Sequence, residues 1–275
     1  MKYSRGNNIK YRRKTGGGGD SLVIYEREHD WIMTPQHHHG LLSGHIARHW
    51  NPAYIKRTER WSEVIFAIFQ HDRAWIDLDE TPFWNDGTKE PYSFIDFPLI
   101  PKLTFYKKGI DEVERQSPYA GLLCSLHYVS FLVGSKEPAA MEFSRQEKAR
   151  QHRLMEQLNL FEVHNKDLLK THFLMVQFCD DLSLYLCIQE PGTPKAEEFP
   201  WFKNGFREIF PFTDGHKIIA EWLDSKQVSL RPFPLAFPAA VSIKVKEVMK
   251  ADIHQWGIEK AYRDTDWKER TFTLK

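Results

Sequence analysis

Cysteine is scarce in this chain, and the placement of the few residues present excludes two kinds of stabilising framework. The sequence has 3 cysteines in 275 residues. They are Cys124, Cys179 and Cys187, and each lies in an apolar helical pattern. Their spacing matches neither a zinc knuckle nor a disulfide framework. We therefore expect reduced, buried cysteines in a cytoplasmic protein.

The chain also lacks long apolar runs and an excess of charge of either sign. No apolar run reaches the length of about 20 residues that a membrane span needs, and the N-terminus lacks the apolar segment of a secretory signal. Lys and Arg number 38 and Asp and Glu 37, for a net charge of +1. This balance gives no argument for binding membranes or nucleic acid. We expect no membrane partner, disfavour nucleic acid, and derive no oligomeric state.

Aromatic residues, by contrast, are plentiful at 14%, within a hydrophobic content of 41%. This composition supports a sizeable core in one large domain or in one domain with a small annex. Residues 1–20 are different, because they are basic and end in four consecutive glycines, Gly16 to Gly19. Such a segment cannot bury a core, so we expect a disordered tail. The glycines lack the Gly-Lys-Ser/Thr ending of a phosphate-binding loop.

Hydrophobic periodicity predicts a mainly α fold. Alternation over residues 21–34 predicts a β-hairpin. Helices are expected over 35–50, 61–75, 109–116, 118–133, 138–161 and 165–189, with a long irregular segment over 77–104. Strands are expected over 228–235, 241–248 and 270–274. We predict a helical bundle over residues 21–217, with a small antiparallel β annex over 218–275 formed by the N-terminal hairpin and the C-terminal strands.

A His-Asp pair, His71-Asp72, stands at the end of the apolar helical run that begins near Trp61. Two ionisable side chains at the end of a buried helix cost free energy unless they are paired or bind something. A metal ion satisfies both, because neutral imidazole and carboxylate are common ligands. If the pair binds a metal, further ligands are expected on the inner faces of other helices.

Helical phase, at about 100° per residue, identifies the other inward ionisable side chains. His39 lies in the middle of its apolar stripe, and His127 lies beside the apolar face of the helix after Pro118. Asp180 shares its face with Leu169, Phe173 and Val176, whereas Asp181 points to the opposite flank and is expected at the surface. His172 also points inward and is a possible further ligand.

The resulting order, His39, His71-Asp72, His127 and Asp180, resembles the HD-domain superfamily of metal-dependent phosphohydrolases over roughly residues 36–190. The chain resembles more closely an uncharacterised bacterial family within or near that superfamily. The segments that carry this likeness are Gln36-His-His-His-Gly-Leu-Leu-Ser-Gly, His71-Asp-Arg-Ala-Trp, Pro91-Tyr-Ser-Phe-Ile-Asp and Asp180-Asp-Leu-Ser-Leu-Tyr-Leu-Cys. One departure is that Arg73-Ala74-Trp75 replaces the usual small residue and Lys after His-Asp.

The resemblance implies an HD-like helical scaffold around one or two divalent transition-metal ions, drawn from Mn, Fe, Co, Ni and Zn. The implied activity is hydrolysis of a nucleotide or another small phosphorylated molecule. The expected metal ligands are His39, His71, Asp72, His127 and Asp180, with His172 as the possible addition. Asp72, Arg73 and His127 are the expected catalytic residues, with Arg73 stabilising phosphoryl charge. Four aromatic residues are candidates for stacking a nucleobase: Trp75, Trp84, Tyr92 and Phe94.

Each assignment has a structural alternative. His39 could instead cap the start of a helix, and His71 and Asp72 could pair with each other. His127 could be a core histidine whose hydrogen bonds are satisfied, and Asp180 could pair with an arginine. Arg73 also suits the surface, and the aromatic residues also suit the core. Two other functions stay open. One is a di-iron oxygenase resembling myo-inositol oxygenase, which an additional inward ligand at His172 would support. The other is a non-catalytic metal-containing binding protein.

Overall fold

The structure is a computed structural model that describes residues 22–55 and 57–275. The predicted disordered tail of residues 1–20 lies outside the described residues. Among the helices that are described, none has the length and apolar character needed to cross a membrane.

Six strands form one sheet. They are β1 (Leu22–Glu26), β2 (Asp30–Pro35), β5 (Ile219–Asp224), β6 (Gln227–Arg231), β7 (Ala239–Met249) and β8 (Trp267–Leu274), in the order β1-β2-β7-β8-β6-β5. The N-terminal hairpin β1–β2 joins the C-terminal strands because β2 pairs antiparallel with β7. The sheet is mixed rather than antiparallel, since β6 and β8 run parallel.

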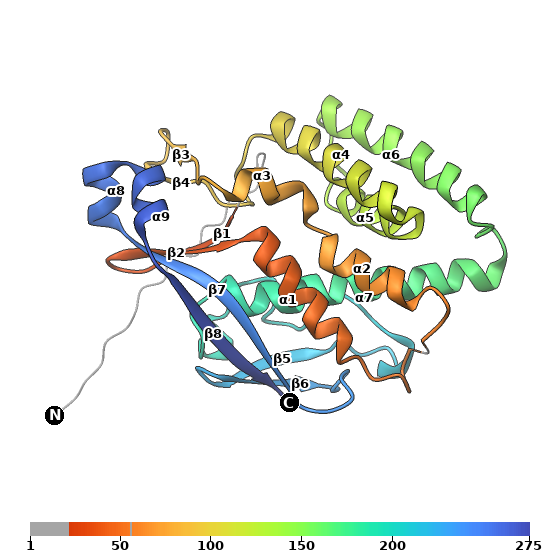
Figure 1. Cartoon of the computed structure of the whole chain (residues 1–275). Helices are drawn as coiled ribbons and strands as arrows, with labels where there is room; N and C mark the ends of the chain where they lie inside the picture. The colour runs from red at the N-terminus through yellow and green to blue at the C-terminus, as the bar shows by residue number, and fades with distance from the viewer. Residues whose placement is uncertain (1–21, 56) are drawn as a thin grey trace.

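The predicted fold class, a helical bundle with a small antiparallel annex, is therefore wrong. The sheet is a full layer of the molecule, against which α1 (Gln36–Arg48) and α7 (Val163–Cys187) pack (Figure 1). Tyr185 of α7, for example, stacks on Trp222 of β5 with ring centroids 5.6 Å apart. One hydrophobic cluster holds side chains of both layers, so the core crosses the predicted boundary between residues 217 and 218.

The other long helices lie on the side of α1 and α7 away from the sheet (Figure 1). They are α2 (Trp61–Gln70), α4 (Leu99–Gln116), α5 (Pro118–Ser130) and α6 (Pro138–Gln157). A pair of short helices, α8 (Lys250–Trp256) and α9 (Ile258–Asp264), connects β7 to β8 and was not expected from the sequence.

The segment over residues 77–104, which was predicted to be irregular, contains regular secondary structure in part. It holds the end of α3 (Ile76–Asp79), the short hairpin β3 (Trp84–Asn85) and β4 (Glu90–Pro91), and the first turns of α4. The prediction began this helix ten residues too late, since four prolines, Pro101 among them, and many aromatic residues suggested an irregular segment. Pro101 is the third residue of α4, in the first turn, where a backbone N–H has no intrahelical partner and proline is tolerated.

Close contact between α1 and α2 brings the predicted ligands together. A Cβ atom on Gly44 would lie 2.3 Å from the ring of Phe69, so only glycine permits this approach of the two helices. Asp79, at the end of α3, fixes the start of α1 by accepting hydrogen bonds from the backbone N–H groups of Gln36 (3.1 Å) and His37 (2.9 Å). These contacts set the position of His39, one turn into α1.

Candidate metal centre

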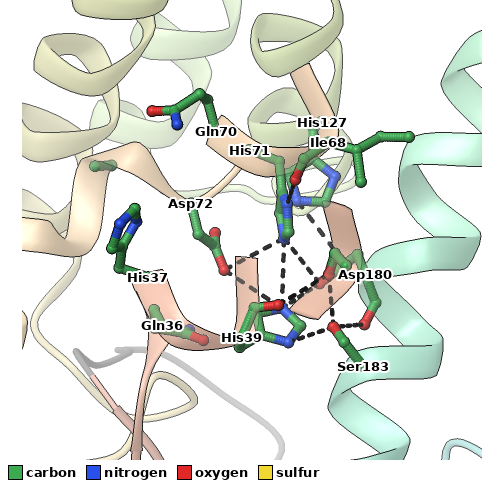
Figure 2. A network of polar contacts seen from close by, with 12 residues as sticks. Gln36, His37, His39, Ile68, Gln70, His71, Asp72, His127, Asp180 and Ser183 are labelled. Atoms are coloured by element: carbon green, nitrogen blue, oxygen red, sulfur yellow. Dashed lines mark hydrogen bonds and ion pairs between the residues drawn. The ribbon is translucent and has the colours of Figure 1, made fainter. Parts of the chain in front are cut away.

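Four buried side chains from three parts of the chain converge between α1, α2 and α7 (Figure 2). His39 comes from α1, His71 and Asp72 follow the last residue of α2, and Asp180 comes from α7. Each offers one ligand atom, and these atoms all lie within 4.8 Å of one another. The group can therefore hold a metal ion, as the helical phase predicted.

The spacing of the four atoms matches a coordination shell. Nε2 of His39 lies 2.9 Å from Oδ1 of Asp180, 3.4 Å from Nε2 of His71 and 3.5 Å from Oδ2 of Asp72. Nε2 of His71 lies 3.4 Å from Oδ1 of Asp180 and 3.5 Å from Oδ2 of Asp72. Around a metal ion with bonds of about 2.0–2.1 Å, ligand atoms at tetrahedral positions are about 3.3–3.4 Å apart, so the donor set fits such an ion.

Hydrogen bonds at the far side of each imidazole direct its other nitrogen to the centre. Nδ1 of His71 donates to the carbonyl of Ile68 at 2.7 Å. Nδ1 of His39 donates to Oγ of Ser183 at 2.5 Å, and Ser183 in turn donates to the carbonyl of Asp180 at 2.9 Å. In neutral rings, both Nε2 atoms then present lone pairs to carboxylate oxygens. Such an arrangement needs a cation or extra protons at its centre, and metal-binding histidines are held in this way.

The end of α2 explains the position of the His-Asp pair. The last carbonyls of a helix have no intrahelical partner, and the carbonyl of Ile68 is satisfied by the ring of His71. The C-terminal end of a helix also carries a partial negative charge, which favours a cation beside it. The local sequence thus both orients His71 and makes the electrostatic potential at the centre more negative.

Without a metal, protons take the place of the cation. Burial opposes a charged His71, but the carboxylates of Asp72 and Asp180 together outweigh it and raise its pKa to about 9. Burial also opposes a charged Asp180, yet hydrogen bonds from His39 and His71 hold its pKa well below the usual range. Burial raises the pKa of Asp72. The metal-free centre is therefore an imidazolium–carboxylate cluster, and metal binding displaces protons from it.

His127, on α5, lies beside this group rather than in it. Its Nε2 is 3.8 Å from Oδ2 of Asp180, and its ring meets that of His71 edge-on with centroids 5.0 Å apart. Both ring nitrogens are buried and have no hydrogen-bond partner. Burial lowers the pKa of His127 to about 3, so the ring is neutral. A neutral, unsatisfied imidazole at this position can contact a second ion or a bound ligand.

Two predicted residues point elsewhere. His172 is buried, but it precedes Asp180 by two turns of α7, and its Nδ1 lies 2.7 Å from the hydroxyl of Tyr119. Arg73 directs its Nε to Glu112 at 2.7 Å, on the wall of a small pocket that also contains Asp77 and Lys108. The structure thus brings neither residue to the four ligands.

Asp181 is not at the surface, contrary to the sequence prediction. It is only 9% exposed because the segment between α7 and β5 covers its face of the helix. Nε of Arg207, from that segment, lies 3.2 Å from Asp181 and 2.7 Å from Glu208. The same guanidinium comes within 4.0 Å of Oδ2 of Asp180. Asp181 and Glu208 therefore hold an arginine beside the candidate metal centre.

A cavity of about 540 Å³ opens onto His39, Asp72 and Asp180. Three cationic side chains line it: Lys102, Arg207 and Lys217. Of the predicted aromatic residues, Trp75 and Phe94 line this cavity, whereas Trp84 lines another pocket and Tyr92 packs on Phe97. Sequence reasoning missed Arg207 and Lys217, since the irregular segment that carries them has no periodicity. Ser183 could have been found, because it follows Asp180 by three residues on the same helical face.

Comparison with known proteins gives a family without an assigned function. The family model described as "Protein of unknown function (DUF3891)" matches residues 22–250. No curated protein and no solved structure matches the chain.

Proposed function

Because the chain belongs to the DUF3891 family of proteins of unknown function, we propose its activity from the site itself: a metal-dependent phosphohydrolase of HD type that acts on a small phosphoester. The observation that carries the proposal is the convergence of four ligand atoms beside a cavity that three of the ligand residues and three cationic side chains line. A metal centre alone suits many reactions. The added cations favour an anionic substrate.

The residues that would hold the ion are His39, His71, Asp72 and Asp180, and His127 is placed to contact a second ion or the substrate. A divalent ion bound there would lower the pKa of a water ligand toward neutrality and offset phosphoryl charge. Asp180 also has a structural role. Its backbone carbonyl accepts a hydrogen bond from the hydroxyl of Ser183, and Ser183 positions His39. Asp72 contributes its Oδ2 and lines the cavity, so it faces the substrate as well as the ion.

Arg207 is the cation best placed for the phosphoryl group, a role that the sequence suggested for Arg73. Its contacts with Asp181 and Glu208 use Nε and Nη2. The contacts described for Arg207 leave Nη1 to meet an oxygen of the substrate, and the residue lines the cavity. A guanidinium held by two carboxylates is preorganised, so little rearrangement is needed when a phosphate binds. Lys217, which pairs with no acidic residue in the described part of the chain, adds a second positive charge.

The oxygenase alternative receives no comparable support. The sequence supported it only through a further histidine ligand at His172, and that side chain is hydrogen-bonded to Tyr119 instead. Binding of a polyol would also not require the cationic lining of the cavity.

The test combines metal analysis with an activity screen. Protein purified without chelator or added metal is analysed for elements, then assayed against a panel of phosphomonoesters and phosphodiesters with and without chelator. We expect at least one transition-metal ion per chain and hydrolysis that the chelator abolishes. Asp72→Asn should abolish it as well, whereas Glu147→Gln should retain it, because Glu147 pairs with Arg150 and does not line the cavity. Stoichiometric metal without turnover on the panel would instead favour a non-catalytic binding protein.

A further inference from the structure

The cavity above the metal centre has an apolar part that the proposed chemistry does not use. Ile95, Phe131 and Trp201 line its outer portion and are 43%, 46% and 52% exposed. Phe94 stands behind them, with its ring meeting that of Trp201 edge-on at 6.2 Å. Closer to the metal ligands, Trp75 and Leu184 continue the apolar surface and are buried.

Large apolar side chains are rarely left exposed together in a concave position. Scattered ones are ordinary on a protein surface, but a group that lines a cavity beside charged residues is typical of a ligand site. The three residues come from separate segments: the loop before α4, the end of α5 and the segment between α7 and β5. Their meeting at one cavity is therefore a feature of the tertiary structure.

An unsatisfied amide marks the inner end of the same cavity. Gln36, the first residue of α1, is 3% exposed, and its Oε1 is buried without a hydrogen-bond partner. Its backbone N–H is bonded to Asp79, and Gln36 lines the cavity together with His39 and Asp72, which Figure 2 draws near it. A buried acceptor of this kind costs free energy unless a ligand or water donates to it.

Polar groups that could read a nucleobase are few. Apart from charged residues and two indole N–H groups, the cavity lining offers only the amide of Gln36 and the hydroxyl of Tyr106. Both belong to buried residues, whereas the outer portion is apolar with cations beside it. A base bound there would exchange hydrogen bonds to water for few hydrogen bonds with uncharged side chains, which costs affinity.

We infer that the site takes phosphoesters of apolar alcohols, aryl or alkyl phosphates, in preference to nucleotides. The inference rests on the proposed function. The phosphoryl group lies at the metal centre with Arg207, a water beside it donates a hydrogen bond to Oε1 of Gln36, and the apolar part of the substrate extends between Phe94, Phe131 and Trp201. Trp201 is the specificity-determining residue, because it is the largest exposed side chain of the lining and covers the outer end of the cavity.

A binding assay tests the preference without requiring turnover. Metal-loaded full-length protein is titrated calorimetrically with phenylphosphonate, methylphosphonate and uridine monophosphate. We expect phenylphosphonate to bind at least about tenfold more tightly than methylphosphonate, since burying a ring removes ample apolar area from water. Uridine monophosphate should bind no better than methylphosphonate. Equal affinities for the two phosphonates, or tightest binding of the nucleotide, would overturn the inference.

Two tryptophan variants localise the effect. Trp201→Ala should lose most of the advantage of phenylphosphonate while leaving methylphosphonate affinity and metal content unchanged. The matched control is Trp256→Ala, whose side chain is 54% exposed on α8 and does not line the cavity. An equal loss of phenylphosphonate affinity in the control, or no loss in Trp201→Ala, would show that the phenyl ring does not bind at Trp201.

Hydrolysis assays separate this inference from the proposed function. Phenyl phosphate, hexyl phosphate, glycerol phosphate and uridine monophosphate are compared by their kcat/KM values. A preference for phenylphosphonate without hydrolysis of any ester would contradict the proposed phosphohydrolase activity but support the inferred preference for apolar phosphoesters. Metal-dependent hydrolysis with equal kcat/KM for phenyl and glycerol phosphate would keep the function and remove the recognition.

Discussion

Two of the clusters of ionisable side chains in the described part of the molecule are built on opposite plans. Between α4, α5 and α6, Arg150 pairs with Asp111, Glu114 and Glu147, the last at 3.0 Å. Every carboxylate there faces the same guanidinium, and Ser125 donates to Glu147 at 2.8 Å. The cluster around His39, by contrast, brings two carboxylates and two imidazoles together with their lone pairs pointing inward.

The difference favours a structural role for the first cluster and a binding role for the second. A network of opposite charges satisfies itself and needs nothing from solution, so it stabilises the packing of helices. Converging lone pairs are satisfied only by a cation or by added protons. The neighbouring cavity supplies access to the second cluster, whereas the hollow beside Arg150 is lined almost entirely by side chains of the network itself and its neighbours on α4 and α6.

The largest expected effect separates two adjacent carboxylates. Asp180→Asn removes a ligand and should reduce metal content to background, a loss beyond the roughly 10–100-fold that changes behind the ligands cost. Asp181→Asn should retain the ion, because Asp181 faces Arg207. Elemental analysis of both purified proteins measures this. Equal metal loss in the two variants would mean that Asp181 is also a ligand.

Chelation should distinguish the two clusters by their stability. A chelator should lower the melting temperature of the wild-type protein but hardly that of His71→Ala, because an ion bound only by the folded state stabilises it. Arg150→Met should lose about 3 kcal/mol of stability, since Glu147 is left buried without its partner. That loss should be the same with and without chelator. If the chelator left the melting temperature of the wild-type protein unchanged, metal binding at this site would be contradicted.

Metal affinity should depend on pH with a defined sign. In the metal-free protein the pKa of His71 is raised to about 9, so the ring carries a proton at neutral pH that a metal must displace. Affinity should therefore rise about tenfold per pH unit toward pH 9 and then level off. The same raised pKa stabilises the metal-free fold below the unfolded-state value of about 6.5, and this contribution is lost as the pH rises through about 9.

Calorimetry in buffers of different ionisation enthalpy measures the protons released on binding. Asp181→Asn serves as the control and should keep the slope. An affinity that does not change between pH 6 and 8 would mean that His71 is not a proton-carrying ligand.

A smaller effect tests which arginine serves the cavity. Arg207→Met should weaken binding of inorganic phosphate to the metal-loaded protein about tenfold, the value of one charge-assisted contact, while metal content is unchanged. Arg73→Met should leave phosphate affinity as in the wild type, because Arg73 pairs with Glu112 away from the cavity. Arg207→Lys, which keeps the charge, should restore part of the affinity. The reverse ranking would return the role to Arg73.

The inward ligands were predictable from sequence because helical phase is a local property. His39, Asp72 and Asp180 each stand on the apolar side of a helix or at its end, and about 100° per residue suffices to find them. Phase gives direction around the axis but not height along it, however. His172 lies about 80° from Asp180 around the helix, still on the inward side, but eight residues displace it by about 12 Å along the axis, and it meets Tyr119 instead.

Other features were decided only by tertiary structure. The sequence predicted that the N-terminal hairpin joins the C-terminal strands, but not a mixed sheet of six strands, because no local pattern states that β6 and β8 will pair in parallel. Arg207, Lys217 and Trp201 come from a segment without periodicity, so nothing in their spacing placed them over the metal centre. That same segment covers Asp181, which phase alone had assigned to the surface. The sequence by itself determined which side chains face the core of each helix; long-range packing decided which of them share a site, because loop placement follows from contacts that no local periodicity records.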